Sequence, residues 1–162
     1  MATRQSHRQR GFTLIEMVVV VMMVGILASA AMPLAALHKR RTQEAELHLA
    51  LRTVRTAIDD YKRAWDQGRI EKKADETGYP PNLEVLVQGV PDATAPNGER
   101  IYFLRRLPRD PFSDDPSLPA GATWGLRSYA SPPDAPAPGK DVFDVYPLRE
   151  GTAMDGTSYR DW

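Results

Sequence analysis

An unbroken apolar segment near the start of the chain limits what this protein can fold into. From Met17 to Ala36 the sequence has twenty residues without a formal charge. About twenty apolar residues in a helix are enough to cross the hydrocarbon core of a bilayer. The segment therefore predicts a membrane-spanning helix, and a chain of 162 residues leaves room for one small domain after it.

The residues before the apolar segment are basic. Residues 1–11 carry Arg4, Arg8 and Arg10 and no acid, whereas the rest of the chain has 18 basic and 21 acidic residues. The basic flank predicts a cytoplasmic N-terminus and an exported remainder. Because that remainder is slightly acidic, we expect no nucleic-acid partner. The chain has no cysteine, which excludes a disulfide framework.

Two processing schemes fit this region. In the first, the apolar segment is a secretory signal that is cut at the small residues Ala28-Ser29-Ala30. That scheme leaves Glu16 as an acid inside the signal and leaves no anchor on the mature chain. In the second, the sequence GFTLIE at residues 11–16 resembles the cleavage motif of type IV prepilins and type II secretion pseudopilins. The family pattern is a short basic leader, a glycine, and a phenylalanine-led apolar helix whose fifth residue is glutamate.

The resemblance implies a processing reaction and an assembly role. A prepilin peptidase would cut between Gly11 and Phe12 and methylate the new amine of Phe12. Residues 1–11 would be a leader, and residues 12–36 would remain as a transmembrane and assembly helix. In this family Glu16 pairs with the Phe12 amine of a neighbouring subunit. A carboxylate at the centre of a membrane helix costs about 2.5–3.5 kcal/mol, and less near its end, so Glu16 needs a partner.

Other residues of the helix leave alternatives open. Thr13 and Glu16 also fit the S/T-x-x-E capping box at a helix start. Gly25 and Pro33 match family positions and weaken a helix, since proline has no N–H to donate to the Ser29 carbonyl. They predict a segment that loosens when the subunit leaves the bilayer. Transmembrane helices also tolerate both residues without such a role.

Residues 37–68 continue the helix in an amphipathic form. Their apolar residues recur at spacings of 4, 3, 4, 3 and 4, which predicts one stripe along a helix face. The stripe consists of Leu47, Leu51, Val54, Ile58, Tyr61 and Trp65, widened by Ala50, Ala57 and Ala64. We expect a sheet to cover this stripe as the core, and we expect the helix to end near Gly68.

The remaining residues, 69–162, contain 13 of the 14 prolines, which predicts a loop-rich head. Asn82 is placed to cap a short helix over Leu83–Val87. Alternation predicts strands at Ala122–Ala130 and Asp141–Leu148, joined by a hairpin loop. The predicted fold is α+β and type IV pilin-like, with the long helix packed on an antiparallel sheet of two to four strands.

The order of motifs in the head resembles the G-type, or major, pseudopilins of type II secretion. The motifs are TGYPP, YFLRRLPRDPF, WGLRSYAS, VFDVYPL and DGTSYRDW. Two departures indicate an atypical member of that family. Residues 112–116 read FSDDP where the family has W-G-N-P-Y, and the Gly-Asp-rich tail is shortened.

Standard members of that family bind calcium in the loop before the C-terminus, and calcium takes six to eight oxygen ligands. The resemblance places candidate ligands at Glu150, Asp155 and Asp161, with the carbonyls of Leu148 and Ser158. The alternative is a polar turn at Asp155-Gly156.

The resemblance thus implies a structural pseudopilin in the bacterial inner membrane, with a periplasmic head, that polymerises into a filament for type II secretion. Expected partners are further copies, other pseudopilins, the prepilin peptidase, the inner-membrane secretion platform and lipid. The alternative is a type IV pilin-like subunit of a surface fibre for adhesion, motility or DNA uptake. We do not expect an enzyme, because the pairs Asp59-Asp60 and Asp114-Asp115 are typical of solvated faces and turns rather than acid–base sites.

Overall fold

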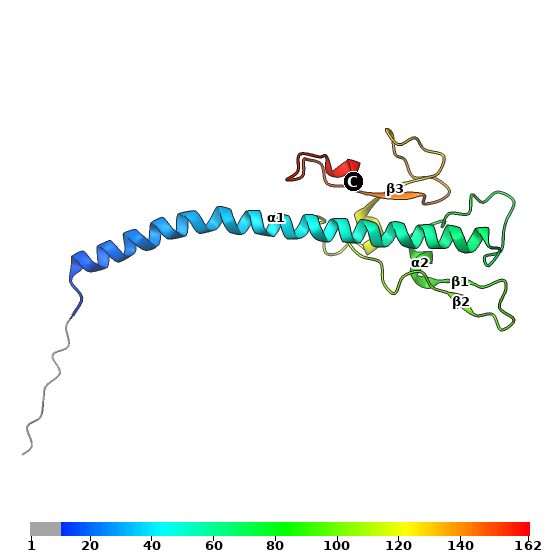
Figure 1. Ribbon diagram of the computed structural model, residues 1–162, viewed down its shortest axis with the longest axis horizontal. Coiled ribbons are helices and arrows are strands. Elements are labelled where there is room, and N and C mark those ends of the chain that lie inside the picture. The colour runs from blue at the N-terminus through cyan, green and yellow to red at the C-terminus, as the bar shows by residue number, and fades with distance from the viewer. Residues whose placement is uncertain (1–10) are drawn as a thin grey trace, which may run out of the picture. The chain divides into compact units, whose positions relative to one another are not determined.

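The computed structural model describes residues 11–162, without the side chains of residues 30–32. The predicted leader therefore lies, apart from Gly11, outside the described residues. The chain divides into two compact units, one that ends at Arg40 and one from Arg41 to Trp162. The elements are α1 (Leu14–Asp66), α2 (Glu84–Gln88), β1 (Val90–Pro91), β2 (Arg100–Ile101), η1 (Ala120–Thr123), β3 (Trp124–Arg127), β4 (Asp144–Pro147) and η2 (Tyr159–Asp161), where η marks a 3₁₀ helix (Figure 1). The predicted α+β fold with a long N-terminal helix is confirmed.

In the first unit, the apolar residues of α1 lie exposed. The exposed fractions of Phe12, Leu14 and Leu27 are 72%, 83% and 70%. The most apolar 18-residue window of α1 has a mean hydropathy of 2.4, and none of it is buried. Helix α1 contains Pro33 without a break in the helical assignment. By length and composition, this part of α1 is suited to cross a membrane.

In the second unit, the predicted stripe of α1 forms the core. Leu47 and Val54 are fully buried, and Trp65 is half-buried against the same cluster. The head supplies the other side of the core with the buried residues Ile70, Leu83, Leu86, Phe112, Trp124, Val142, Val145, Ala153 and Tyr159. The apolar face of the helix is therefore covered by residues that are spread along the sequence of the head from Ile70 to Tyr159.

The head contains two separate two-stranded antiparallel sheets, whereas the sequence predicted one sheet of two to four strands. β1 pairs with β2, and β3 pairs with β4 so that Trp124 lies opposite Pro147 and Arg127 opposite Asp144. Figure 1 shows β3 on one side of α1 and the β1–β2 pair on the other. The small sheets follow from the prolines, because a proline cannot donate to a ladder and Pro91 and Pro147 end two of the strands.

Both predicted strands are longer than the observed ones. η1 occupies the residues just before Trp124, so β3 begins two residues later than predicted. Before β4, the N–H of Val142 donates to the carbonyl of Pro80 at 2.8 Å instead of to β3. The hairpin connection between the two strands is confirmed, but part of each predicted strand is used for contacts with neighbouring loops.

The short helix α2 starts one residue later than predicted. The N–H of Val85 donates to Asn82 Oδ1 at 3.0 Å, as expected for a capping side chain. The amides of Phe103 and Leu104 both donate to the carbonyl of Leu86, at 3.1 and 2.9 Å. These bonds fix α2 against the following segment and place Leu86 in the core.

Candidate functional site

The helix α1 begins within the motif predicted for processing and assembly. The Glu16 N–H donates to Thr13 Oγ1 at 3.3 Å, so Thr13 caps the helix through its hydroxyl. Within the described part of the chain, the Glu16 carboxylate makes no hydrogen bond or ion pair, so it does not complete the capping box. The charged end of Glu16 is exposed and faces no partner from residues 11–162.

The neighbours of Glu16 are equally exposed. The Phe12 side chain has an exposed fraction of 72%. A Cβ atom added at Gly11 or Gly25 would meet nothing within 4 Å. Contacts among residues 11–162 therefore do not explain the residue types at these positions. The roles predicted for Gly11, Phe12, Glu16, Gly25 and Pro33 all require a partner or a change of environment.

The residues predicted as calcium ligands lie in the tail loop, by which we mean residues 148–162. Glu150, Asp155 and Asp161 are exposed, and so is Leu148. Asp155 Oδ1 accepts hydrogen bonds from the N–H and the hydroxyl of Thr157, at 2.9 and 2.6 Å. These two bonds lower the pKa of Asp155, and the bond from the hydroxyl has the larger effect. This is the turn chemistry that the alternative interpretation predicted.

The described residues do not fit a calcium ion. In residues 11–162 no three His, Cys, Asp or Glu side chains gather into a group that could hold a metal. The Ser158 carbonyl accepts the N–H of Asp161 at 3.1 Å. Calcium needs several convergent oxygens, often from carboxylates, and the tail loop instead spreads its acids over an exposed surface.

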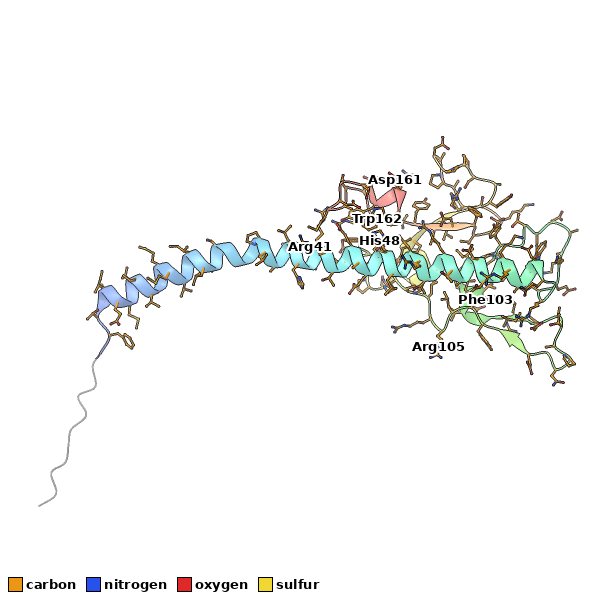
Figure 2. The ribbon with its side chains drawn as sticks, viewed as in Figure 1. Arg41, His48, Phe103, Arg105, Asp161 and Trp162 are labelled. Atoms are coloured by element: carbon orange, nitrogen blue, oxygen red, sulfur yellow. The ribbon has the colours of Figure 1, made fainter. Side chains whose placement is uncertain are left out.

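Three α1 side chains that the sequence did not assign to a site contact the tail loop. They are Glu44, His48 and Arg55, and Figure 2 shows His48 beside Trp162. Their spacings of four and seven residues place them along one edge of the buried stripe. That periodicity was visible in the sequence, but nothing in it showed that the chain would return to this edge more than 100 residues later.

A buried carboxylate fixes the segment LPRDPF of the family motif. The exposed fraction of Asp110 is 4%, and its Oδ1 accepts the N–H of Phe112 at 2.8 Å. Burial raises the pKa of Asp110, while the hydrogen bond from Phe112 and the charge of Arg149 oppose the shift. The bond turns the chain so that the Phe112 ring packs against Tyr159, with 5.0 Å between ring centroids.

The two adjacent acid pairs have the structural roles that the sequence predicted. Asp60 forms an ion pair with Arg63 at 2.6 Å on the helix surface. Asp115 accepts hydrogen bonds from the N–H and the hydroxyl of Ser117, at 2.9 and 2.6 Å, in a turn. One carboxylate of each pair is thus engaged in local structure, as expected for a solvated face and a turn.

Comparison with known proteins decides the family. Residues 6–32 match the prokaryotic N-terminal methylation motif. The type II secretion system core protein G of Klebsiella michiganensis is 30% identical over 142 residues, which are 85% of this chain and 91% of that protein. This chain belongs to the type II secretion system core protein G family. The Pseudomonas aeruginosa core protein G is 30% identical over 98% of both chains, and that of Vibrio cholerae is 28% identical over 98% of this chain.

Membership of the core protein G family fits the geometry of both units. Proteins of this family are pseudopilins, which are structural and not enzymatic, and the chain carries their N-methylation motif on an exposed apolar helix. The similarity to core protein G extends through the head, so it does not depend on the N-terminal motif alone. No solved structure matches the chain at a significant level.

Proposed function

We propose that this chain is cleaved between Gly11 and Phe12 by a prepilin peptidase, methylated at Phe12, and assembled into a periplasmic filament that drives type II secretion. The observation that carries the proposal is the methylation motif at residues 6–32 on a chain whose head also resembles core protein G. The predicted scheme with a signal cut at Ala28-Ser29-Ala30 is disfavoured, because it would remove the motif that the family retains.

The proposal assigns a place to each part of the chain. Residues 1–11 are the leader, residues 12–36 cross the inner membrane, residues 37–68 continue the helix, and residues 69–162 form the periplasmic head. The basic flank supports a cytoplasmic N-terminus. The apolar residues of the first unit are exposed, which supports contact with lipid before assembly and with other subunits afterwards.

Glu16 is proposed to pair with the Phe12 amine of a neighbouring copy. The amine that cleavage creates is a cation near neutral pH. The Glu16 carboxylate is exposed and makes no ion pair within residues 11–162, which supports a partner outside the chain. An ion pair between copies would neutralise both charges in an apolar surrounding and would set the axial position of one subunit against the next.

Further partners follow from the same family. We propose that the chain contacts other pseudopilins and the inner-membrane secretion platform. A surface fibre is the second candidate, but the curated relatives carry the name of a secretion component, which favours secretion. Calcium binding, which the resemblance predicted, is not part of the proposed function, and no step of that function depends on it.

The test of processing is mass spectrometry of the mature protein isolated from its own host. We expect an N-terminal methylated Phe12. Gly11→Leu is expected to leave the precursor uncut, because the peptidase must fit the backbone at the scissile bond. Gly25→Leu is the matched control, since it makes the same change in open space within α1 and is expected to be processed normally. A mature chain that begins at Ala31 would contradict the proposal.

A further inference from the structure

The tail loop closes through its own backbone. The N–H of Ala153 donates to the Thr157 carbonyl at 2.8 Å, and the N–H of Tyr159 donates to the Gly151 carbonyl at 3.2 Å. Thr152 and Ser158 form an antiparallel bridge between the same two limbs. Backbone hydrogen bonds within the chain therefore join the two limbs of the loop.

A carboxylate from α1 lies where the two limbs of the loop meet. Glu44 Oε1 accepts the N–H of Met154 at 3.1 Å and the hydroxyl of Tyr159 at 2.6 Å. One oxygen thus joins residues from both limbs. A cation site presents convergent oxygens, whereas here the loop presents two donors to an anion. The polarity is the reverse of what a calcium ion requires.

The end of the loop is fastened to the same edge of α1. The Trp162 ring stacks on His48, with 3.8 Å between ring centroids and 18° between planes. The Trp162 indole N–H donates to Thr157 Oγ1 at 2.6 Å, which ties the ring to the turn at Asp155. The Trp162 side chain therefore contacts both α1 and the turn within the tail loop.

Arg55 connects the tail loop to the sheet. Its Nη1 donates to the main-chain oxygen of Trp162, its Nε to Asp144 Oδ1 at 2.7 Å, and its Nη2 to the Val145 carbonyl at 3.0 Å. A guanidinium presents several donors in a fixed plane, so one side chain can hold three acceptors. Arg55 thus binds β4 and the tail loop at once.

We infer that the tail loop is held on α1 by Glu44, His48 and Arg55 in place of a calcium ion, and that its folding is independent of metal. Glu44 bridges the two limbs, His48 packs against the terminal ring, and Arg55 links the loop to β4. The departure of this chain from the family's calcium-binding tail is thereby compensated by contacts within the chain. This inference does not depend on the proposed function.

The test is hydrogen exchange in the tail loop, measured on the full chain in detergent micelles, with either EGTA or millimolar calcium chloride present. We expect the same exchange rates for residues 148–162 in both solutions. Glu44→Ala is expected to raise these rates about tenfold in both, because two hydrogen bonds to one charged group are lost. Glu46→Ala is the matched control, since Glu46 is an exposed acid two residues further along α1, and it is expected to leave the rates unchanged.

Glu44→Gln separates the hydrogen bonds from the charge. A glutamine oxygen can still accept both bonds, so we expect most of the protection to return. Two results would overturn the inference. One is faster tail exchange in EGTA that calcium reverses, with Asp155→Asn reproducing the effect of EGTA. The other is an unchanged tail in Glu44→Ala, which would mean that the loop does not depend on this carboxylate.

Discussion

The two parts of α1 use their apolar side chains in opposite ways. In the first unit Leu27 and its apolar neighbours are exposed, whereas in the second unit Leu47 and the rest of the stripe are buried by the head. Exposed apolar area is unfavourable in water by about 25 cal/mol per Å². The second part is therefore stabilised by the chain that contains it, and the first part requires lipid or other subunits.

This contrast explains why the two parts differ in their polar residues. Around the buried stripe, Glu44 and Arg55 have partners in the head. In the first unit, the Glu16 carboxylate makes no such bond within residues 11–162. Glu44 and Arg55 thus find their hydrogen-bond partners within the chain. For Glu16 we propose that the partner belongs to a second copy of the chain.

The largest expected effect comes from the charge in the first unit. Glu16→Val should insert and be processed, but filaments should be lost. Each added subunit would bring an unpaired Phe12 amine into an apolar interior, and breaking a buried ion pair costs about 3–5 kcal/mol. The measurement is the yield of filaments sheared from cells that carry only the variant.

Thr13→Ala is the control for Glu16→Val. It removes the hydroxyl that caps α1, which should cost about 1 kcal/mol of helix stability and leave filaments in place. A normal filament yield with valine at position 16 would exclude the pairing role and would leave Glu16 without an assembly function.

The second prediction tests the contrast directly with one substitution in each part of α1. Leu47→Ala should lower the free energy of unfolding of the head by about 2–5 kcal/mol, because it leaves a cavity in the core. Leu27→Ala, at a side chain that is 70% exposed, should leave that free energy unchanged. Both are measured by denaturant unfolding of the full chain in micelles. Equal losses would show that the two parts of the helix do not differ as described.

The third prediction concerns the residue that covers the end of the stripe. Gly78 has φ of +87°, and a Cβ atom there would lie 2.7 Å from the Trp65 ring. Gly78→Ala should lower the free energy of unfolding by about 1–2 kcal/mol because of the backbone conformation, and by about 1–3 kcal/mol more because of the clash. Gly98 also has a positive φ, +68°, but a Cβ atom there would lie in open space. Gly98→Ala should therefore show only the loss that comes from the backbone conformation. If both variants unfold at the same denaturant concentration, packing on Trp65 contributes nothing.

The smallest expected effect is electrostatic and lies beyond the end of α1. Hydrogen bonds from Thr94 and then Arg69 lower the pKa of Asp92 from 3.8 to about 2. Because its pKa is lowered in the folded state, the ionised Asp92 stabilises the fold at pH values above the ordinary pKa. This contribution is lost as the pH falls from about 4 towards 2. Asp92→Asn should therefore lower the Tm at pH 6, and the Tm values of the variant and the wild-type protein should converge near pH 2. Parallel curves over this range would contradict the assignment.

The sequence by itself determined the features that repeat locally. The spacing of Leu47, Leu51 and Val54 predicted which face of the helix is buried, because a helical period is a local property. The Asn82 cap, the hairpin around β3 and β4, and the Asp155 turn are equally local and were also predicted. The N-terminal motif was readable for a similar reason, since a peptidase recognises a short continuous segment.

Only the tertiary structure decided which distant segments meet. Two small sheets replaced the single predicted sheet because prolines such as Pro91 and Pro147 interrupt the ladders, and the sequence could not show on which side of α1 each pair packs. The same is true of the tail loop. Glu44 and Tyr159 are 115 residues apart, and their hydrogen bond depends on the path of the whole head. A carboxylate that accepts hydrogen bonds from a loop and a carboxylate that binds a cation look the same in a sequence. Only the groups that the fold places around the carboxylate distinguish the two cases.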